Sequence, residues 1–493
     1  MDFTKLPALL TYQAQSPLLF SSGLFLFLFT GFLLLYALLY RKEWTTLRIA
    51  YVTLFSLYFY YKSSGIWFLL LLFTATSDFC IGLAMQKQSS QQVKKWLVTL
   101  SLCINLGMLA YFKYFNFILE LFTFSKPYEP LDIFLPVGIS FFTFQSISYV
   151  IDIYRGRIAP LRRWVDYVFY VSFFPQLVAG PIVRARDFIP QIRRTPGLTS
   201  LCFGEGLYLI VCGLFKKCII SDYISLNFVD RIFDAPLLYT GVENLMGVYG
   251  YTLQIYCDFS GYSDMAIGIA LLLGFRFNIN FDSPYQSASI TEFWRRWHIS
   301  LSSWLKDYLY ISLGGNRKGT VRQYINLFIT MLLGGLWHGA SLRFVLWGAL
   351  HGAALAIHKA CMRFFPSFFK TSGSEMSPLR RIMGILITFH VVCFGWIFFR
   401  ANDMETALSV LQQIATQFHP EVFMQFVEGY PIIVALMLVG YTLHFLPKST
   451  EAWLQQHITS APLLLQIAIF SILIFCIIQM KSADVQPFIY FQF

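Results

Sequence analysis

Two histidines occupy the segments of this sequence best suited to proton-transfer chemistry. His338 lies between two apolar runs, and Gly334, Gly335 and Gly339 surround it. Glycine lets a backbone or a substrate approach closely. A neutral imidazole makes a good general base near neutral pH, and burial lowers its pKa further. A lone histidine on an apolar face is usually structural, but the glycine-rich break favours a functional role for His338. His298 lies in a tryptophan-rich block upstream.

Other polar residues lie inside apolar runs, where they are costly and tend to face a partner or a cavity. Asp258, Tyr262 and Asp264 fall in one such run. The two aspartates are six residues apart, which places them about 240° apart around a helix, so they are not an obvious acid–base pair. Each is expected to hydrogen-bond a neighbouring helix or to line a cavity. His351 and His358 are interpreted as structural.

The segment from Glu292 to Leu309 has helical amphipathic periodicity. On one helix, its tryptophans and leucines fall within an arc of about 100°, and its charged residues fall on the opposite side. Such a helix is expected to lie in the membrane interface as an anchor. Alternatively, its basic residues receive a phosphorylated donor. The residues predicted to contact substrate are Trp297, Arg295, Arg296, Trp337, Asp258 and Tyr262.

The composition predicts an all-α protein in a membrane. Of the 493 residues, 57% are hydrophobic and 13% are charged, about half the charge of a soluble protein. The net charge of +11 comes from short basic clusters between apolar runs. This is the positive-inside pattern, and it argues against nucleic-acid binding. The nine cysteines have no CxxC spacing, so neither a metal site nor a disulfide framework is expected.

The apolar runs predict a polytopic helical bundle, treated as one integral membrane domain over residues 1–493. Because Tyr167 to Pro181 is apolar but flanked by arginines, it is predicted to be re-entrant, which leaves about 11 or 12 crossings. Basic loops after the first, third and fifth runs place the N-terminus outside. The predicted spans are 20–40, 47–61, 65–85, 96–119, 134–154, 207–220, 242–274, 324–337, 344–360, 381–399, 431–446 and 462–480.

Several of these blocks resemble the membrane-bound O-acyltransferase (MBOAT) family, and above all its bacterial branch for alginate O-acetylation and D-alanyl transfer. The likeness covers most of the chain, with a core over about residues 130–360 and more variable helices over 380–493. The blocks that carry it are FSSGLFLFLF (20–29), LPVGISFFTFQSISYVIDIYRG (135–156), FFPQLVAGPIVR (173–184), YCDFSGYSDMAIG (256–268), SPYQSASITEFWRRWHISLSSWLKDYLYISLGGNR (283–317) and GGLWHGASLRFVLWGALHG (334–352).

This resemblance implies a ring of tilted helices around a central tunnel, with His338 as the catalytic histidine and His298 as its partner. In acyl transfer, His338 would be the general base or a transient nucleophile. His298 would orient the donor or polarise its carbonyl. The donor would be acyl-CoA, most simply acetyl-CoA, or an acylated carrier protein, and no bound cofactor or metal is expected.

The expected function is O-acylation of a cell-surface or secreted polysaccharide from the bacterial inner membrane. Membrane lipid surrounds the chain, and an extracytoplasmic SGNH-type acyltransferase is the expected partner. Alternatives within the same chemistry are D-alanyl transfer to a teichoic-acid-type polymer and acylation of a lipid or protein. A transporter using Asp258 and Asp264 is the alternative from a different class, although no internal repeat supports it. A scaffold without catalysis is disfavoured by the two histidines.

Overall fold

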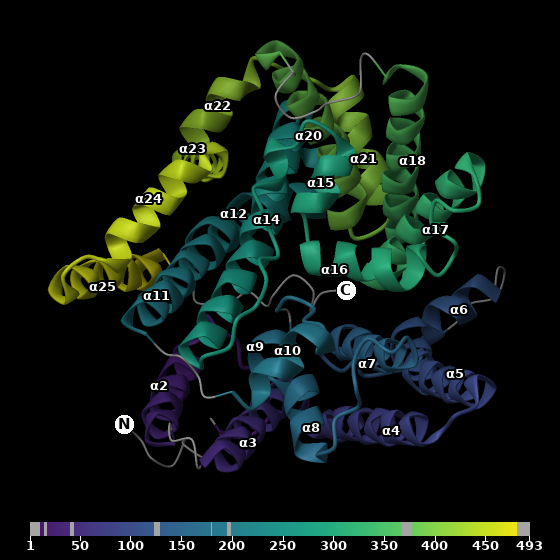
Figure 1. Cartoon of the computed structure of the whole chain (residues 1–493). Coiled ribbons are helices and arrows are strands. Elements are labelled where there is room, and N and C mark those ends of the chain that lie inside the picture. Colours follow the sequence, from purple (N-terminus) through teal and green to yellow (C-terminus); the bar gives the residue numbers. More distant parts are fainter. Residues whose placement is uncertain are drawn as a thin grey trace. The chain divides into compact units, whose positions relative to one another are not determined.

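The computed structural model describes residues 10–13, 17–39, 44–122, 129–178, 180–194, 199–366 and 377–480. Regular structure in these ranges is helical throughout, which confirms the all-α prediction (Figure 1). The described residues form two compact units, one with residues 10–210 and 262–278, and the other with residues 211–261 and 279–480. The prediction of one membrane domain with a core over about 130–360 stays a prediction.

The first unit is built from apolar helices around an aromatic core. Phe174 lies at its centre, where its ring contacts those of Phe25, Phe55 and Phe59 at centroid distances of 5.1–6.3 Å. Such buried rings contribute large apolar areas. The helices are α2 (Gly23–Leu38), α3 (Thr45–Ser64), α4 (Phe68–Lys87), α5 (Gln91–Leu109), α6 (Phe115–Phe122), α7 (Ile139–Tyr154), α8 (Trp164–Ser172), α9 (Phe174–Leu177), α10 (Ala185–Ile192) and most of α11 (Ser200–Leu214).

The second unit contains both motif histidines. Short π-helical segments interrupt it at Phe215–Ser221, Ser225–Val229 and Leu305–Tyr310. Its helices are α12 (Asp222–Ile224), α13 (Asp230–Asp234), α14 (Gly241–Leu272, whose last residues belong to the first unit), α15 (Ile290–Arg296), α16 (Ile299–Trp304), α17 (Thr320–His338), α18 (Leu342–Phe364), α20 (Pro378–Arg400), α21 (Met404–Thr416), α22 (Val422–Gly429), α23 (Pro431–Phe445), α24 (Lys448–Thr459) and α25 (Leu463–Met480).

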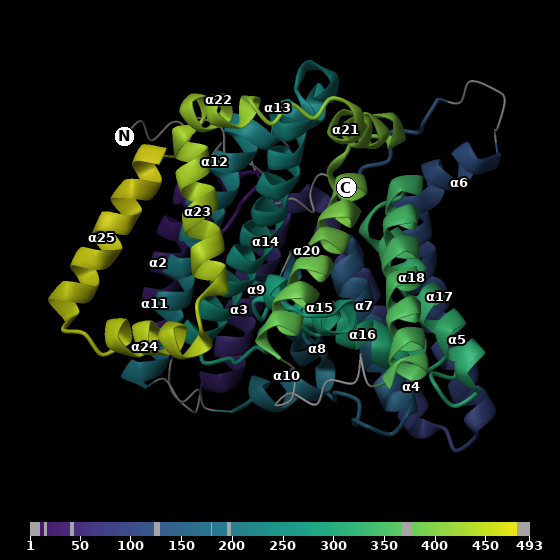
Figure 2. The same cartoon turned by 90° about the horizontal axis from the view of Figure 1, so that it is seen from above.

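Helices α17 and α18 lie side by side, and glycines allow their close approach (Figures 1 and 2). A Cβ on Gly348 would lie 3.1 Å from the Cα atoms of both Gly335 and Leu332. A Cβ on Gly352 would lie 3.0 Å from the Cα of Phe328. Small residues at helix contacts are the usual means of close packing between membrane helices. Gly348 and Gly352 therefore let α18 pack closely on α17, the helix that carries His338.

Replacing Gly348 by alanine is expected to destabilise the protein by about 1–3 kcal/mol, because the added methyl meets backbone rather than a movable side chain. Thermal unfolding in detergent measures the effect. Gly107→Ala is the matched control, since α5 leaves open space around Gly107, and alanine is favoured over glycine in a helix interior. Equal stability of the two variants would contradict this account of the α17–α18 contact.

All twelve predicted spans coincide with helices, but few of those helices are long and apolar enough to cross a membrane singly. Four described helical runs meet that requirement, or up to six if each of two bent pairs forms one span. Helices α24 and α25 form one of these bent pairs, with an angle of 113° between them, and the change of direction can be followed in Figure 2. Length and hydropathy therefore do not support the expected 11 or 12 crossings, because the other helices are shorter or interrupted by polar residues.

Contacts between distant segments agree with the predicted alternation of the spans. In the second unit, Arg400 pairs with Asp230 at 2.6 Å, and Gln286 Nε2 donates to the His444 carbonyl at 2.7 Å. In the first unit, Val137 N donates to Ser64 Oγ at 3.0 Å. Each contact joins segments that the alternation places at the same membrane face. Which face is outside stays a prediction.

The backbone is broken where a re-entrant segment was predicted. Helix α8 ends at Ser172, the short α9 follows, and an extended stretch begins at Gly180. Gln176 Nε2 donates to the Tyr170 carbonyl at 2.5 Å, so a side chain satisfies part of the interrupted backbone. Its placement within a membrane stays a prediction.

Candidate active site

His338 is the last residue of α17, and its side chain is enclosed by aromatic rings. The residue is 3% exposed. Its ring centroid lies 5.0 Å from that of Trp337, 5.0 Å from that of Trp347 and 5.2 Å from that of Phe399. The helix ends because Gly339 takes an extended conformation with φ of −160°. The predicted break at this motif is confirmed, and it places an imidazole in a nearly dry aromatic environment.

His298 interrupts a segment for which the sequence predicts one continuous helix, and that prediction is wrong. Helix α15 ends at Arg296, and α16 begins at Ile299. Between them, His298 adopts left-handed backbone with φ of 42°, a conformation that is costly for a residue with a side chain. The break turns the ring into the protein, where the residue is 0% exposed. Such strain at a buried motif residue is a mark of functional sites.

The Nδ1 atom of His298 lies near Asn280, in the loop that precedes α15, and 3.4 Å from the hydroxyl oxygen of Ser300 in α16. The distance from this Nδ1 to Asn280 Oδ1 is 3.1 Å. The same oxygen accepts from the Ser300 backbone N–H at 3.2 Å and from its hydroxyl at 2.8 Å. Burial lowers the pKa of His298 to about 3, because the charged ring would lose its hydration. The ring is therefore neutral at physiological pH.

Trp337 lies between the two histidines. Its ring centroid is 6.2 Å from that of His298 and 5.0 Å from that of His338. Trp347, which contacts His338, stacks on Trp396 with a centroid distance of 5.8 Å. The ring of Trp297 lies 5.0 Å from that of Trp396. The structure thus brings together four predicted site residues, namely His298, His338, Trp297 and Trp337.

The interfacial-anchor interpretation of the tryptophans is also wrong. Trp294, Trp297 and Trp304 are all buried within the protein. Trp294 Nε1 donates to His351 Nδ1 at 3.3 Å, which agrees with a structural role for His351. An amphipathic pattern shows only that one face of a helix is apolar, and it does not show whether lipid or protein covers that face. Here that face meets protein instead of lipid.

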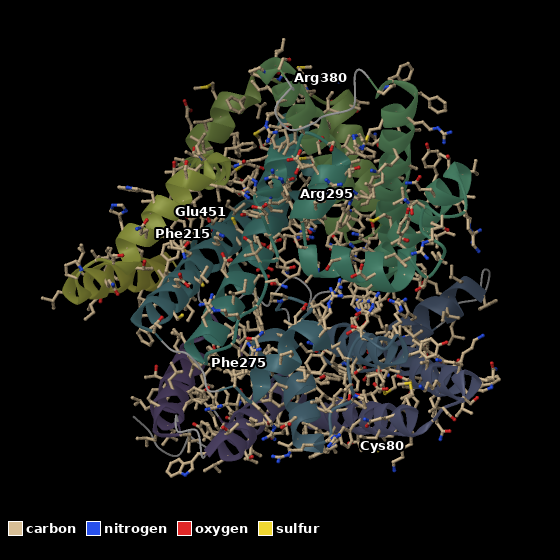
Figure 3. All side chains as sticks on the ribbon, in the orientation of Figure 1. Cys80, Phe215, Phe275, Arg295, Arg380 and Glu451 are labelled. Carbon is tan, nitrogen blue, oxygen red and sulfur yellow. The ribbon has the colours of Figure 1, made fainter. Side chains whose placement is uncertain are left out.

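The two predicted arginines differ in their surroundings. Arg295 is exposed on α15, where Figure 3 labels it. Arg296 pairs with Glu292 at 2.8 Å and donates to the Asp282 carbonyl at 3.2 Å, so it braces the loop. Their predicted contact with a phosphorylated donor stays a prediction.

Asp258 and Tyr262 are not part of this aromatic enclosure. Asp258 forms an ion pair with Lys217, a buried cation that also lies 2.8 Å from Asp222. Tyr262 belongs to the first unit, where its ring stacks on Phe20 at 4.7 Å. The expectation that Asp258 meets a neighbouring segment is confirmed, while the predicted contact of Asp258 and Tyr262 with substrate stays a prediction.

Sequence reasoning missed three residues that support the site. Asn280 lies 3.1 Å from the Nδ1 of His298, and Trp396 stacks on Trp347. His444 of α23 accepts a hydrogen bond at its Nε2 from the Tyr285 backbone N–H at 3.0 Å. The polar pair Asn278 and Asn280 in the run FNINF was a usable signal for Asn280. Nothing in the local pattern pointed to the other two, because tertiary packing brings them in from distant helices.

Comparison with known proteins identifies the family. Residues 163–398 match the model of the membrane-bound O-acyltransferase family. The chain is 42% identical over 399 residues to the probable alginate O-acetylase AlgI of Pseudomonas aeruginosa, covering 79% of this chain and 73% of that protein. It is 38% identical over 432 residues to the peptidoglycan O-acetyltransferase of Helicobacter pylori, covering 80% and 79%.

A more distant relative belongs to the other expected branch. The chain is 30% identical over 280 residues to the teichoic acid D-alanyltransferase of Bacillus subtilis, covering 53% of this chain and 68% of that protein. The relatives confirm the resemblance on which the site residues were chosen. This chain belongs to the membrane-bound O-acyltransferase family and is a multi-pass membrane O-acyltransferase.

Proposed function

We propose that this enzyme takes an acyl group, most simply acetyl, from a cytoplasmic thioester and passes it across the membrane for O-acylation of a cell-surface or secreted polysaccharide. The observation that carries the proposal is the pair of buried histidines joined through Trp337. Acetyl transfer is favoured over D-alanyl transfer because the alginate O-acetylase relative is more similar, at 42% against 30% identity.

In the proposed reaction, His338 removes the proton from the acceptor hydroxyl. The hydroxyl oxygen then attacks the thioester carbonyl, so a C–O bond forms and the C–S bond breaks. The imidazolium returns its proton to the departing thiolate, which leaves as a thiol. In the alternative mechanism with covalent catalysis, the ring nitrogen of His338 first attacks the thioester carbonyl and takes the acyl group. The acceptor hydroxyl then attacks the carbonyl of the acylated ring. His298 orients the donor or polarises its carbonyl.

The proposed donor is acyl-CoA or an acylated carrier protein. In this proposal, the guanidinium of the exposed Arg295 binds the phosphates of the donor. The acceptor is reached from the opposite face, with an extracytoplasmic SGNH-type acyltransferase as the partner that places the group on the polymer. The described residues include no folded soluble domain to hold a polysaccharide. The membrane is the bacterial inner membrane.

Inside-out vesicles with acetyl-labelled CoA outside and polysaccharide inside test the proposal. When the partner transferase is present, labelled polymer is expected in the lumen, with a matching loss of label from CoA and no free acetate. Full transfer of acetyl to free polymer without any partner would contradict the proposed need for a partner transferase. Passage of intact acetyl-CoA without loss of the thioester would point to a transporter and overturn the function.

The orientation carries its own prediction. With the N-terminus outside, a cysteine in place of the exposed Leu238 should react with a membrane-impermeant thiol reagent in intact cells. A cysteine in place of the exposed Arg317 should react only after the membrane is opened. Cys80 and Cys103 are exposed and are first replaced by alanine. The reverse labelling pattern would show that the N-terminus lies inside and that the donor enters from the opposite face of the membrane.

A further inference from the structure

The surroundings of His298 determine which of its ring nitrogens carries the proton. The Ser300 backbone N–H can only donate, and it lies 3.2 Å from Asn280 Oδ1, so that side-chain atom is an oxygen. The Ser300 hydroxyl donates its one hydrogen to the same atom at 2.8 Å, so it has none left for His298 Nδ1, which lies 3.4 Å from its oxygen. An amide oxygen only accepts. The His298 Nδ1, 3.1 Å from this oxygen, must therefore carry the hydrogen.

The remaining ring nitrogen is then a bare acceptor. A neutral imidazole has one N–H, so a proton on Nδ1 leaves Nε2 with its lone pair. Burial lowers the pKa of His298 to about 3, which keeps this form across the physiological range. Nε2 is buried and makes no hydrogen bond to any residue that the structure describes. Unsatisfied buried acceptors are rare in folded proteins and call for a partner.

Aromatic rings pack around the imidazole of His298. The His298 ring lies 4.6 Å from Phe259 in an edge-to-face arrangement and 6.2 Å from Trp337. The backbone also holds the ring, because the Ile299 N–H donates to the Asn280 carbonyl at 2.9 Å. Asn280 thus hydrogen-bonds both to the side chain of His298 and to the backbone N–H of the next residue, Ile299.

We infer that Asn280 is a positioning residue that holds His298 as its Nδ1–H tautomer, so that Nε2 accepts a hydrogen bond from an N–H or O–H group of a substrate. The substrate half of this inference rests on the proposed function. A bare nitrogen cannot donate to a thioester carbonyl, so His298 orients a substrate and does not polarise the carbonyl. The donated hydrogen comes from an amide of the thioester's pantetheine arm or from a hydroxyl of the acceptor other than the one that His338 deprotonates.

Nitrogen-15 NMR of the full-length protein in lipid nanodiscs tests the tautomer without any substitution. Histidine is labelled with ¹⁵N and asparagine with ¹³C, and dipolar coupling to the asparagine side chain selects the ring held by Asn280. The expected spectrum shows a protonated Nδ1 coupled to asparagine and an unprotonated Nε2. A protonated Nε2 would overturn the inference. This outcome is independent of activity, so the tautomer is tested even if the proposed function fails.

Steady-state acetyl transfer tests the role of Asn280 with two variants. Asn280→Leu removes the acceptor and should lower kcat/KM about ten-fold, the loss typical of one hydrogen bond. Asn280→Asp keeps an oxygen at the same position and should retain most of the activity. Asn244→Leu is the matched control, because it removes another buried amide of the second unit, which donates to the Pro236 carbonyl at 3.0 Å.

The kinetic pattern identifies the hydrogen that Nε2 accepts. A rise in KM for the thioester in Asn280→Leu indicates the pantetheine amide, and an unchanged thioester KM with a lower kcat/KM for the acceptor indicates the hydroxyl. Unchanged kinetics in Asn280→Leu would overturn the positioning role. Equal losses in Asn280→Leu and Asn244→Leu would also overturn it, since they would show a general effect on stability. If Asn280→Leu does not fold, Asn280→Asp and the wild-type spectrum decide.

Discussion

His338→Gln is expected to reduce acyl transfer by about 10²–10⁴-fold, the usual contribution of a general base, and by more if the ring is also the nucleophile. Glutamine fills similar space and cannot take up the proton. The aromatic enclosure should persist, because Trp347 packs on Phe399 and Trp396, and Trp337 packs on His298. The measurement is single-turnover loss of the labelled thioester in membranes with a matched amount of enzyme.

His390→Gln is the control for this substitution, because His390 is an exposed histidine on α20 with a hydrogen bond to Tyr249 at 2.9 Å. It should keep wild-type activity. Trapping labelled protein by acid quench separates the two forms of catalysis, since only a nucleophilic His338 becomes acylated. A His338→Gln enzyme that stays folded and transfers acetyl at the wild-type rate would remove His338 from the mechanism.

The largest loss of stability is expected from Lys217→Met. Lys217 and Asp258 form an ion pair in which each side chain is 3% exposed, and Asp222 lies 2.8 Å from the same ammonium. Removing the cation leaves buried carboxylates without compensation, which costs about 3–5 kcal/mol in proteins. Thermal unfolding in detergent measures the change. The double variant Lys217→Met/Asp258→Leu should recover much of the loss, because no uncompensated charge then remains at position 258.

Lys448→Met gives the matched comparison at a surface pair. Lys448 pairs with Asp282, but its side chain is 59% exposed. Exposed pairs contribute about 0–1 kcal/mol, since water screens the attraction. If Lys217→Met were no more destabilising than Lys448→Met, the buried pair would not be structural. Asp258 would then return as a candidate for the substrate contact that its position in an apolar run suggested.

Helix positions and the two histidines were predictable from the sequence because both depend on local signals. Apolar runs of sufficient length defined every helix that was expected, and the glycines around His338 indicated where α17 ends. The conformation of His298 was not predictable. Its segment carries the periodicity of one helix, and the left-handed residue is held by Asn280, which lies outside that segment.

The burial of the tryptophans shows a second limit. Lipid and protein interiors are both apolar, so periodicity alone cannot separate an anchor on a bilayer from a face packed inside a protein. Trp297 and Trp304 satisfied the interfacial pattern, yet both are enclosed by other helices. The pairing of Lys217 with Asp258 was likewise invisible, because separate segments supply the two charges and only folding brings them together.

The support that α23 gives to the histidine loop has a consequence for biosynthesis. His444 accepts a hydrogen bond from the Tyr285 backbone, and its carbonyl accepts one from Gln286. Both contacts brace the loop that carries Asn280. A ribosome completes α23 long after both motif histidines have emerged. The nascent chain therefore holds both motif histidines before it holds the contacts that brace the loop beside His298, and that loop is complete only when the late helices have been inserted and docked.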